Sequence, residues 1–213
     1  MRPDYHVLMT PDYWQQASDE LARVDPAMAD LVARFGGASL ASHGEPFVTL
    51  ARSIVGQQIS VKAADSVWAR LSSALPVLNP AAVLGCDAET LRACGLSARK
   101  VEYLGDLATR FASGEIHVGR WGAMSDAEII GELTAVRGIG VWTAEMFLIF
   151  HELRPDVFPL DDIGLQKAVA QYYCGGERPS RKALAEIGER WRPWRSVATW
   201  YLWRSLDPVP VAY

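Results

Sequence analysis

The sequence predicts an all-α protein, and three observations support that fold class. Apolar residues recur at the 3.6-residue spacing of an amphipathic helix in nearly every segment of the chain. No run of four or more residues alternates between apolar and polar as a half-buried strand does, and no βαβ rhythm appears. Glycine, proline and helix-capping residues separate the periodic segments. We therefore expect about ten helices.

The first half of the chain contains helical segments with recognisable ends. Asp25 and Pro26 are the residue types of an N-cap and a first helical position, and Gly36 ends the helix that they begin. Gly95 and Gly114 end two later segments in the same way. We expect helices within residues 11–25, 25–37, 46–56, 60–75, 87–96 and 98–114.

The second half of the chain continues the helical pattern. Ser125 and Glu128 have the spacing of a capping box at the start of a helix. Loops at about residues 36–46 and 114–124 are the predicted connections between lobes. We expect further helices within residues 125–136, 141–153, 163–173, 180–191 and 194–206.

The composition is that of a soluble globular protein. Of the 213 residues, 50% are hydrophobic and 22% are charged, and the net charge is -4. No apolar run approaches the roughly 20 residues of a membrane span, and the N-terminus has no signal-peptide core. We expect a cytoplasmic protein with no membrane association. Residues 178–204 are locally basic, which leaves a solvated helix face and a nucleic-acid surface equally open.

Cysteine and histidine usage indicates neither a disulfide framework nor a metal cluster. The 3 cysteines form no C-x-x-C pair, and the 4 histidines are scattered along the chain. Buried free thiols are the expected state of the cysteines. We expect no cofactor.

A Gly-Ile-Gly turn joins two predicted helices and is the most specific local signal. Gly138 and Gly140 flank Ile139, which can fill the space between the helices. Unpaired N–H groups at the start of the second helix can then bind a phosphate through hydrogen bonds and the helix dipole. A tight helical hairpin without a ligand is the alternative, and this motif alone leaves both open.

Two adjacent carboxylates, Asp161 and Asp162, follow the second helix of that hairpin and precede another helix. Adjacent like charges in an apolar setting are costly, so the pair needs a reason. A carboxylate at a helix N-terminus accepts backbone N–H bonds and is favoured by the dipole. The pair alone fits helix caps or solvated turn residues as well as it fits catalysis.

Four motifs in the same order resemble the helix-hairpin-helix (HhH-GPD) DNA glycosylases. They are "RSIVGQQISVKAA", "GIGVWTA", "DVFPLDD" and "ERWRPWRS", and the resemblance spans about residues 44–206. The match is nearest to the 3-methyladenine DNA glycosylase II (AlkA-like) branch. The chain looks like a compact form of it, without the N-terminal β-containing domain of larger members.

The resemblance implies two helical lobes with the active-site cleft between them. One lobe would be residues 46–120 with a wedge turn. The other would be residues 1–45 plus 121–213, carrying the hairpin and the catalytic aspartate. The implied activity is flipping of alkylated, cationic purines from double-stranded DNA and hydrolysis of the N-glycosidic bond. A monomer is the default expectation, and the motifs do not discriminate among methylated purines and hypoxanthine.

The resemblance also implies roles for individual residues. Asp162 would be the catalytic carboxylate, and Asp161 a structural neighbour. Gln58 matches the residue that intercalates into DNA, and Met146 stands where the family has a tyrosine. Trp191 and Trp194 more plausibly pack the core. The implied base pocket is Trp142, Trp203 and Met146, the implied DNA contacts are Gln57, Gln58, Gly138, Ile139, Gly140 and Thr143, and the carbonyls that would hold a monovalent cation are those of Thr134, Val136 and Ile139.

Two other functions compete with this interpretation. A non-catalytic helix-hairpin-helix DNA-binding module would use Asp162 only as a cap. A bifunctional glycosylase/lyase is disfavoured because Trp142 stands where those enzymes have a Schiff-base lysine. An iron–sulfur cluster of the endonuclease III type needs four closely spaced cysteines, and only Cys174 lies in the second half of the chain.

Overall fold

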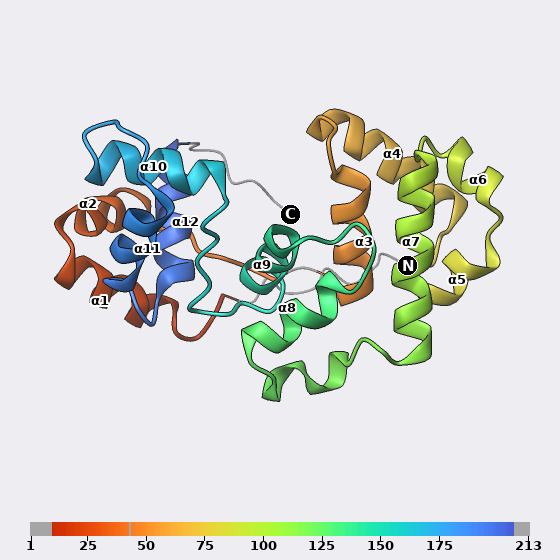
Figure 1. The fold of residues 1–213 in the computed structure, drawn as a ribbon, viewed down its shortest axis with the longest axis horizontal. Coiled ribbons are helices and arrows are strands. Elements are labelled where there is room, and N and C mark those ends of the chain that lie inside the picture. Colours follow the sequence, from red (N-terminus) through yellow and green to blue (C-terminus); the bar gives the residue numbers. More distant parts are fainter. Residues whose placement is uncertain (1–9, 43, 207–213) are drawn as a thin grey trace. The chain divides into compact units, whose positions relative to one another are not determined.

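The computed structural model describes residues 10–42 and 44–206, and these residues form helices and no β-strand (Figure 1). The predicted all-α class is therefore confirmed. The elements are α1 (Trp14–Val24), α2 (Pro26–Phe35), α3 (Pro46–Gly56), α4 (Val61–Ala74), α5 (Pro80–Gly85), α6 (Ala88–Ala93), α7 (Ala98–Ser113), the 3-10 helix η1 (Val118–Ala123), α8 (Asp126–Thr134), α9 (Val141–Phe150), α10 (Ile163–Tyr173), α11 (Arg181–Glu189) and α12 (Arg195–Leu206).

Membrane spans were also sought in this part of the chain. None of the helices between residues 10 and 206, residue 43 aside, has the length and apolar character needed to cross a bilayer. The expectation that the N-terminus lacks a signal peptide falls mainly on residues 1–9, which lie outside the described residues.

The chain divides into two compact units. Unit 1 is Met1–His43 with Leu148–Tyr213, and unit 2 is Gly44–Phe147. The boundary between residues 43 and 44 lies close to the predicted one between residues 45 and 46. The boundary between residues 147 and 148 falls within α9, whereas the predicted one lies between residues 120 and 121. The hairpin between α8 and α9 therefore belongs to unit 2, whereas the sequence-based boundaries group it with Asp162.

Contacts inside unit 2 explain why the hairpin belongs there. The Asp106 carboxylate on α7 accepts a hydrogen bond of 2.8 Å from the backbone N–H of Arg137 in the turn. Trp121 of η1 packs edge-to-face against Phe147 of α9, with ring centroids 5.3 Å apart. The contact between Asp106 and Arg137 joins residues on both sides of the predicted boundary, and sequence periodicity does not reveal such a tertiary pair.

Helix α12 is the centre of unit 1 and contacts α1, α2 and α10. All seven residues from 196 to 202 are buried. A helix that is covered on several sides lacks the one-sided polar stripe of a surface helix. Its burial fixes the direction of the residues that follow, among them Trp203.

Asp25 begins α2 as predicted and also joins three parts of unit 1. Its Oδ1 accepts hydrogen bonds from the backbone N–H groups of Ala27 and Met28, and Pro26 occupies the first turn. Its Oδ2 accepts from the indole N–H of Trp191 and from the hydroxyl of Tyr173, both at 3.0 Å. Asp25 is only 7% exposed, so these donors replace the water that the carboxylate has lost.

Helix α7 has the same central place in unit 2, where it contacts α3, α5 and α6. Leu104, Leu107 and Ala108 lie on its buried face. Ser97 caps its N-terminus by accepting from the N–H of Lys100, and Gly114 ends it in a left-handed conformation. The predicted capping box of Ser125 and Glu128 is present at the start of α8.

Two short elements are missing from the sequence prediction. Helix α5 spans only six residues, too few for a helical repeat to show, although Asn79 as N-cap and Pro80 at the first position mark its start. The 3-10 helix η1 occupies part of the predicted loop at 114–124, and its Trp121 is almost fully buried.

We expect Asp25→Ala to lower the free energy of unfolding by about 3 kcal/mol, because a helix cap is lost and two buried donors lose their acceptor. Urea unfolding followed by circular dichroism measures the change. Asp25→Asn keeps one acceptor oxygen but turns an NH2 group toward the donors on the other side, so it should also lose stability. An unchanged free energy of unfolding in both variants would contradict a hydrogen-bonding role for this carboxylate.

Candidate functional site

Asp162 lies at the N-cap of α10 and is 9% exposed. Its Oδ1 accepts a hydrogen bond of 2.6 Å from the backbone N–H of Leu165 and one of 2.8 Å from the indole N–H of Trp203. One donor belongs to the helix that Asp162 begins, and the other comes from α12. The carboxylate is therefore held from two directions within unit 1.

Trp203 approaches Asp162 closely because Gly164 has no side chain. A Cβ on Gly164 would lie 3.1 Å from Oδ1 of Asp162 and 3.1 Å from Cδ1 of Trp203. On its other side the indole stacks on the Phe150 ring, with centroids 5.6 Å apart and planes at 10°. Gly164 and Phe150 were not predicted as site residues, and the only sequence signal was a glycine in the first turn of a helix.

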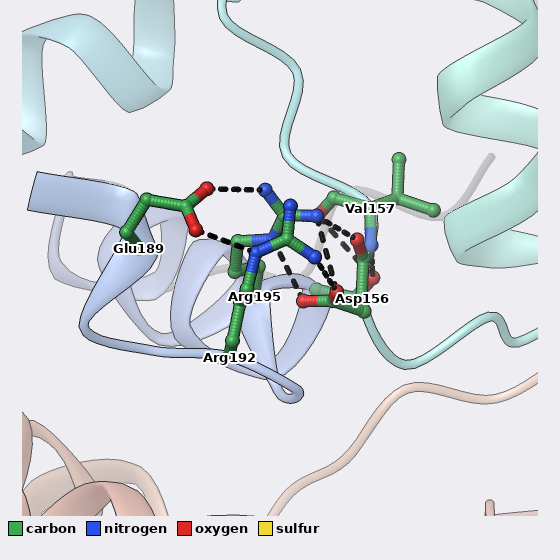
Figure 2. A network of polar contacts seen from close by, with 6 residues as sticks. Asp156, Val157, Glu189, Arg192 and Arg195 are labelled. Carbon is green, nitrogen blue, oxygen red and sulfur yellow. Dashed lines mark hydrogen bonds and ion pairs between the residues drawn. The ribbon is translucent and has the colours of Figure 1, made fainter. Parts of the chain in front are cut away.

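The segment that leads to Asp162 is fixed at its start by an ion-pair network (Figure 2). Asp156 accepts hydrogen bonds of 2.7 Å from Nε of Arg195 at Oδ1 and from the Arg192 guanidinium at Oδ2. The backbone N–H of the next residue, Val157, donates to the Ser196 hydroxyl at 2.9 Å. These bonds join the two motifs "DVFPLDD" and "ERWRPWRS". Two arginines of the basic stretch 178–204 therefore form ion pairs inside unit 1.

Asp161 has a different environment from its neighbour. Its carboxylate forms an ion pair with Arg181 at the start of α11, and both side chains are more than half exposed. An exposed ion pair contributes little to stability. The adjacent aspartates therefore separate into one buried and one solvated residue.

The other predicted core tryptophans are hydrogen-bonded inside unit 1. Trp191 is fully buried and donates to Asp25. Trp194 donates to the Glu20 carboxylate at 2.6 Å and stacks on the Tyr13 ring. Neither is available as a pocket wall.

The hairpin of unit 2 has the geometry that the Gly-Ile-Gly pattern predicts. Helix α8 ends at Thr134, Gly138 has a φ of +85°, and α9 begins at Val141. A Cβ on Gly138 would lie 2.2 Å from the Tyr103 ring, so only glycine fits. Ile139 is 4% exposed, so its side chain is buried.

Gly140 differs from Gly138 in that nothing lies within 4 Å of the position of its missing Cβ. Its φ is not in the left-handed region. Its carbonyl accepts the first helical bond of α9, from the N–H of Ala144. Neither internal packing nor backbone conformation requires glycine here.

The hairpin carbonyls named as cation ligands are partly unpaired. The Val136 carbonyl accepts from the N–H of Ile139 at 3.1 Å. In residues 10–42 and 44–206, no backbone N–H outside the helices donates to the carbonyls of Thr134 or Ile139. Hard oxygen donors of this kind fit a monovalent cation.

The wedge turn, residues 57–60 between α3 and α4, also lies in unit 2. Gln58 is exposed and has a φ of +58°, a conformation that non-glycine residues rarely adopt. The Gln57 side chain is bound within the protein, because its amide donates to the carbonyl of Gly138 at 2.8 Å. Gln57 is therefore an internal contact between the wedge turn and the hairpin.

The remaining predicted site residues lie in the first turns of α9. Trp142 is 38% exposed, whereas Thr143 and Met146 are 7% and 5% exposed. The candidate residues thus fall into two sets. Unit 1 brings together Asp162, Trp203 and Phe150, and unit 2 brings the hairpin and the wedge turn together.

Comparison with protein families and curated proteins places these features in context. Residues 51–193 match the model of the HhH-GPD superfamily base excision DNA repair proteins. DNA-3-methyladenine glycosylase 1 of Schizosaccharomyces pombe is 34% identical over 165 residues, which cover 76% of this chain and 72% of that protein.

Solved structures show the same fold. The S. pombe 3-methyladenine DNA glycosylase Mag1 in complex with abasic DNA has a TM-score of 0.76 at 30% identity, covering 92% of this chain and 100% of that one. A DNA-3-methyladenine glycosidase from Bacillus halodurans has a TM-score of 0.80 at 32% identity, covering 97% and 93%.

Gly138 and Gly140 form a matched pair for testing the hairpin. We expect Gly138→Ala to lower the free energy of unfolding by about 2–4 kcal/mol, because the new Cβ overlaps the Tyr103 ring and the backbone is strained. Gly140→Ala should change it by less than about 1 kcal/mol. Urea unfolding of both variants measures the difference.

The two variants should also differ in binding. Folded Gly140→Ala is expected to bind duplex DNA about three- to tenfold more weakly, because its Cβ occupies the space next to the helix N-terminus. Fluorescence anisotropy with a labelled duplex provides the dissociation constant. Wild-type affinity in this variant would show that no phosphate approaches Gly140.

Proposed function

Because the chain belongs to the HhH-GPD superfamily of base excision DNA repair proteins, we propose that it is a monofunctional DNA glycosylase acting on alkylated, cationic purines in duplex DNA. The observation that carries the proposal is the buried Asp162 carboxylate, hydrogen-bonded by Leu165 and Trp203. Asp25 also combines a helix cap with an indole donor, so the superfamily membership supports the assignment beside this geometry.

The chemistry of the substrate explains why one carboxylate suffices. Alkylation at N3 or N7 of a purine places positive charge on the base and weakens the glycosidic bond, so the leaving group needs little protonation. The enzyme has to expose the bond, stabilise an oxocarbenium-like sugar and admit water. An anionic carboxylate next to the sugar stabilises its positive charge and orients or deprotonates the attacking water.

In this mechanism Asp162 is the catalytic residue, and its surroundings define how it acts. Two N–H donors on Oδ1 restrain the carboxylate without supplying a proton to a leaving group. The Asp156 network restrains the chain segment before it. Preorganised charge of this kind acts without reorganisation at the moment of bond cleavage.

We propose that Trp142, Trp203 and Met146 line the base pocket. Electron-rich indole faces attract cationic bases, and the thioether of Met146 adapts its shape to a flat ring. The stacking of Trp203 on Phe150 leaves the indole in a fixed orientation. Extrusion of the base from the stack precedes its recognition in such a pocket.

DNA binding is assigned to unit 2. The backbone N–H groups at the start of α9, next to Gly140 and Thr143, would contact a phosphate. The carbonyls of Thr134, Val136 and Ile139 would hold a monovalent cation, which supplies positive charge beside that phosphate. Gln58 would enter the duplex as the wedge. Such phosphate contacts are sequence-independent and weaken with salt.

Two further parts of the proposal rest on the same argument. Trp142 occupies the position at which lyase-active relatives carry a lysine, so hydrolysis without strand cleavage is expected. The proposal includes a cytoplasmic location and, as the default expectation, a monomer. The rival function is a non-catalytic DNA-binding module, favoured only by the cap geometry of Asp162.

A release assay tests the proposal directly. DNA alkylated with methyl groups is incubated with the protein, and free methylated purine and abasic sites are measured. We expect base release by the wild type, no strand cleavage before alkali treatment, and at least a hundredfold loss in Asp162→Asn. Retained DNA binding in that variant is the control. Binding without release by the wild type would indicate the module, and near-normal turnover of Asp162→Asn would remove the catalytic assignment.

Trp203→Phe separates positioning from pocket packing. The phenyl ring keeps an aromatic stack on Phe150 but has no N–H for Asp162. We expect the single-turnover rate to fall about tenfold while the affinity for abasic DNA changes less than threefold, because a hydrogen bond to a charged group is worth about 1.5–3 kcal/mol. A loss of affinity with an unchanged rate would show that the indole serves only the pocket.

A further inference from the structure

Three residues of helix α7, spaced three apart, contact the two elements of unit 2 to which we assign DNA binding. These elements are the wedge turn, through the end of α3 before it, and the hairpin. The Lys100 ammonium donates to the carbonyl of Val55 at 2.6 Å, in the last turn of α3 before the wedge turn. Tyr103 packs beneath Gly138, and Asp106 accepts from the backbone N–H of Arg137. Residues three apart lie on one face of a helix, so a single surface of α7 carries the ends of both elements.

A second contact joins the two elements directly. The Gln57 side-chain amide donates to the carbonyl of Gly138 at 2.8 Å, so the wedge turn is tied to the turn of the hairpin. One N–H group of the Gln57 amide is therefore used in a hydrogen bond within the protein and cannot donate to DNA at the same time.

The adjacent residue is the strained one. Gln58 holds a φ of +58°, which costs a non-glycine residue free energy and persists only where the surroundings enforce it. The surroundings here are the Lys100 bond before the turn, the Gln57 bond at the turn and the Ser60 cap of α4 after it. The unusual backbone conformation thus lies at a residue whose side chain is exposed.

We propose that Gln57, supported by Lys100, couples phosphate binding at the hairpin to presentation of the Gln58 wedge, and that Gln57 is a positioning residue rather than a DNA contact. The proposal rests on the proposed function, because it assigns the partners of the hairpin and the wedge. A hairpin seated on a phosphate then fixes the reach of Gln58 into the duplex. Without the Gln57 bond, the wedge turn relaxes and Gln58 no longer fills the space left by an extruded base.

The test is a double-mutant cycle of wild type, Gln57→Met, Gln58→Ala and the double variant. Dissociation constants are measured for a duplex containing the abasic analogue tetrahydrofuran and for the same duplex undamaged. On the abasic duplex we expect Gln58→Ala to weaken binding about tenfold in the wild type and less than threefold in Gln57→Met, since coupled residues are not additive. Gln57→Met should weaken binding to the undamaged duplex less than twofold.

Lys100→Met provides an independent second arm, because it removes the bond to Val55 without touching either turn. We expect it to reduce the effect of Gln58→Ala in the same manner. Thermal unfolding of each variant, within a few degrees of the wild type, shows that the fold is retained.

Three outcomes would overturn the inference. Additive effects of Gln57→Met and Gln58→Ala would show that no coupling exists. Equal losses on both duplexes in Gln57→Met would make Gln57 a direct DNA contact. A wild type that does not prefer the abasic duplex would remove the proposed function and the coupling with it, whereas a preference with additivity removes the coupling alone.

Discussion

A carboxylate withdrawn from water has to receive its hydrogen bonds from the fold, and this requirement organises unit 1. Asp25 and Asp162 meet it in the same manner, with the first N–H groups of a helix on one side and a tryptophan indole on the other. The two residues lie at the starts of α2 and α10, and both indoles come from the C-terminal part of the chain. The same local arrangement therefore serves stability in one case and, in our proposal, catalysis in the other.

The two aspartates differ in their other neighbours. Asp25 also receives the Tyr173 hydroxyl, whose pKa is raised by burial and by the nearby carboxylate, so both of its oxygens are held inside the core. Asp162 follows a turn in a segment that is restrained at Asp156, and it borders an indole stacked on Phe150. A cap with an indole donor is thus no signature of an active site by itself, and the assignment of Asp162 depends on the superfamily as well as the geometry.

The all-α fold and most helix ends were predictable from the sequence, because periodicity and capping are local properties. Asp25 with Pro26 and Ser125 with Glu128 show this. The boundary between the units was not, since it depends on pairs such as Asp106 with Arg137. Gly138 was correctly singled out for its left-handed backbone. Gln57 illustrates the limit: the family resemblance implies a DNA contact for this residue, and only the geometry shows that its amide donates to Gly138.

The left-handed backbone of Gln58 also restricts which residues can replace the proposed wedge in evolution. β-Branched side chains are strongly penalised at positive φ, so valine and isoleucine are excluded whatever their fit in a duplex. Asparagine and glycine adopt this conformation readily but are short. A substitution at this position thus gains either side-chain length or a low cost of the positive φ. A long side chain without a β-branch, such as glutamine, is one compromise between the two.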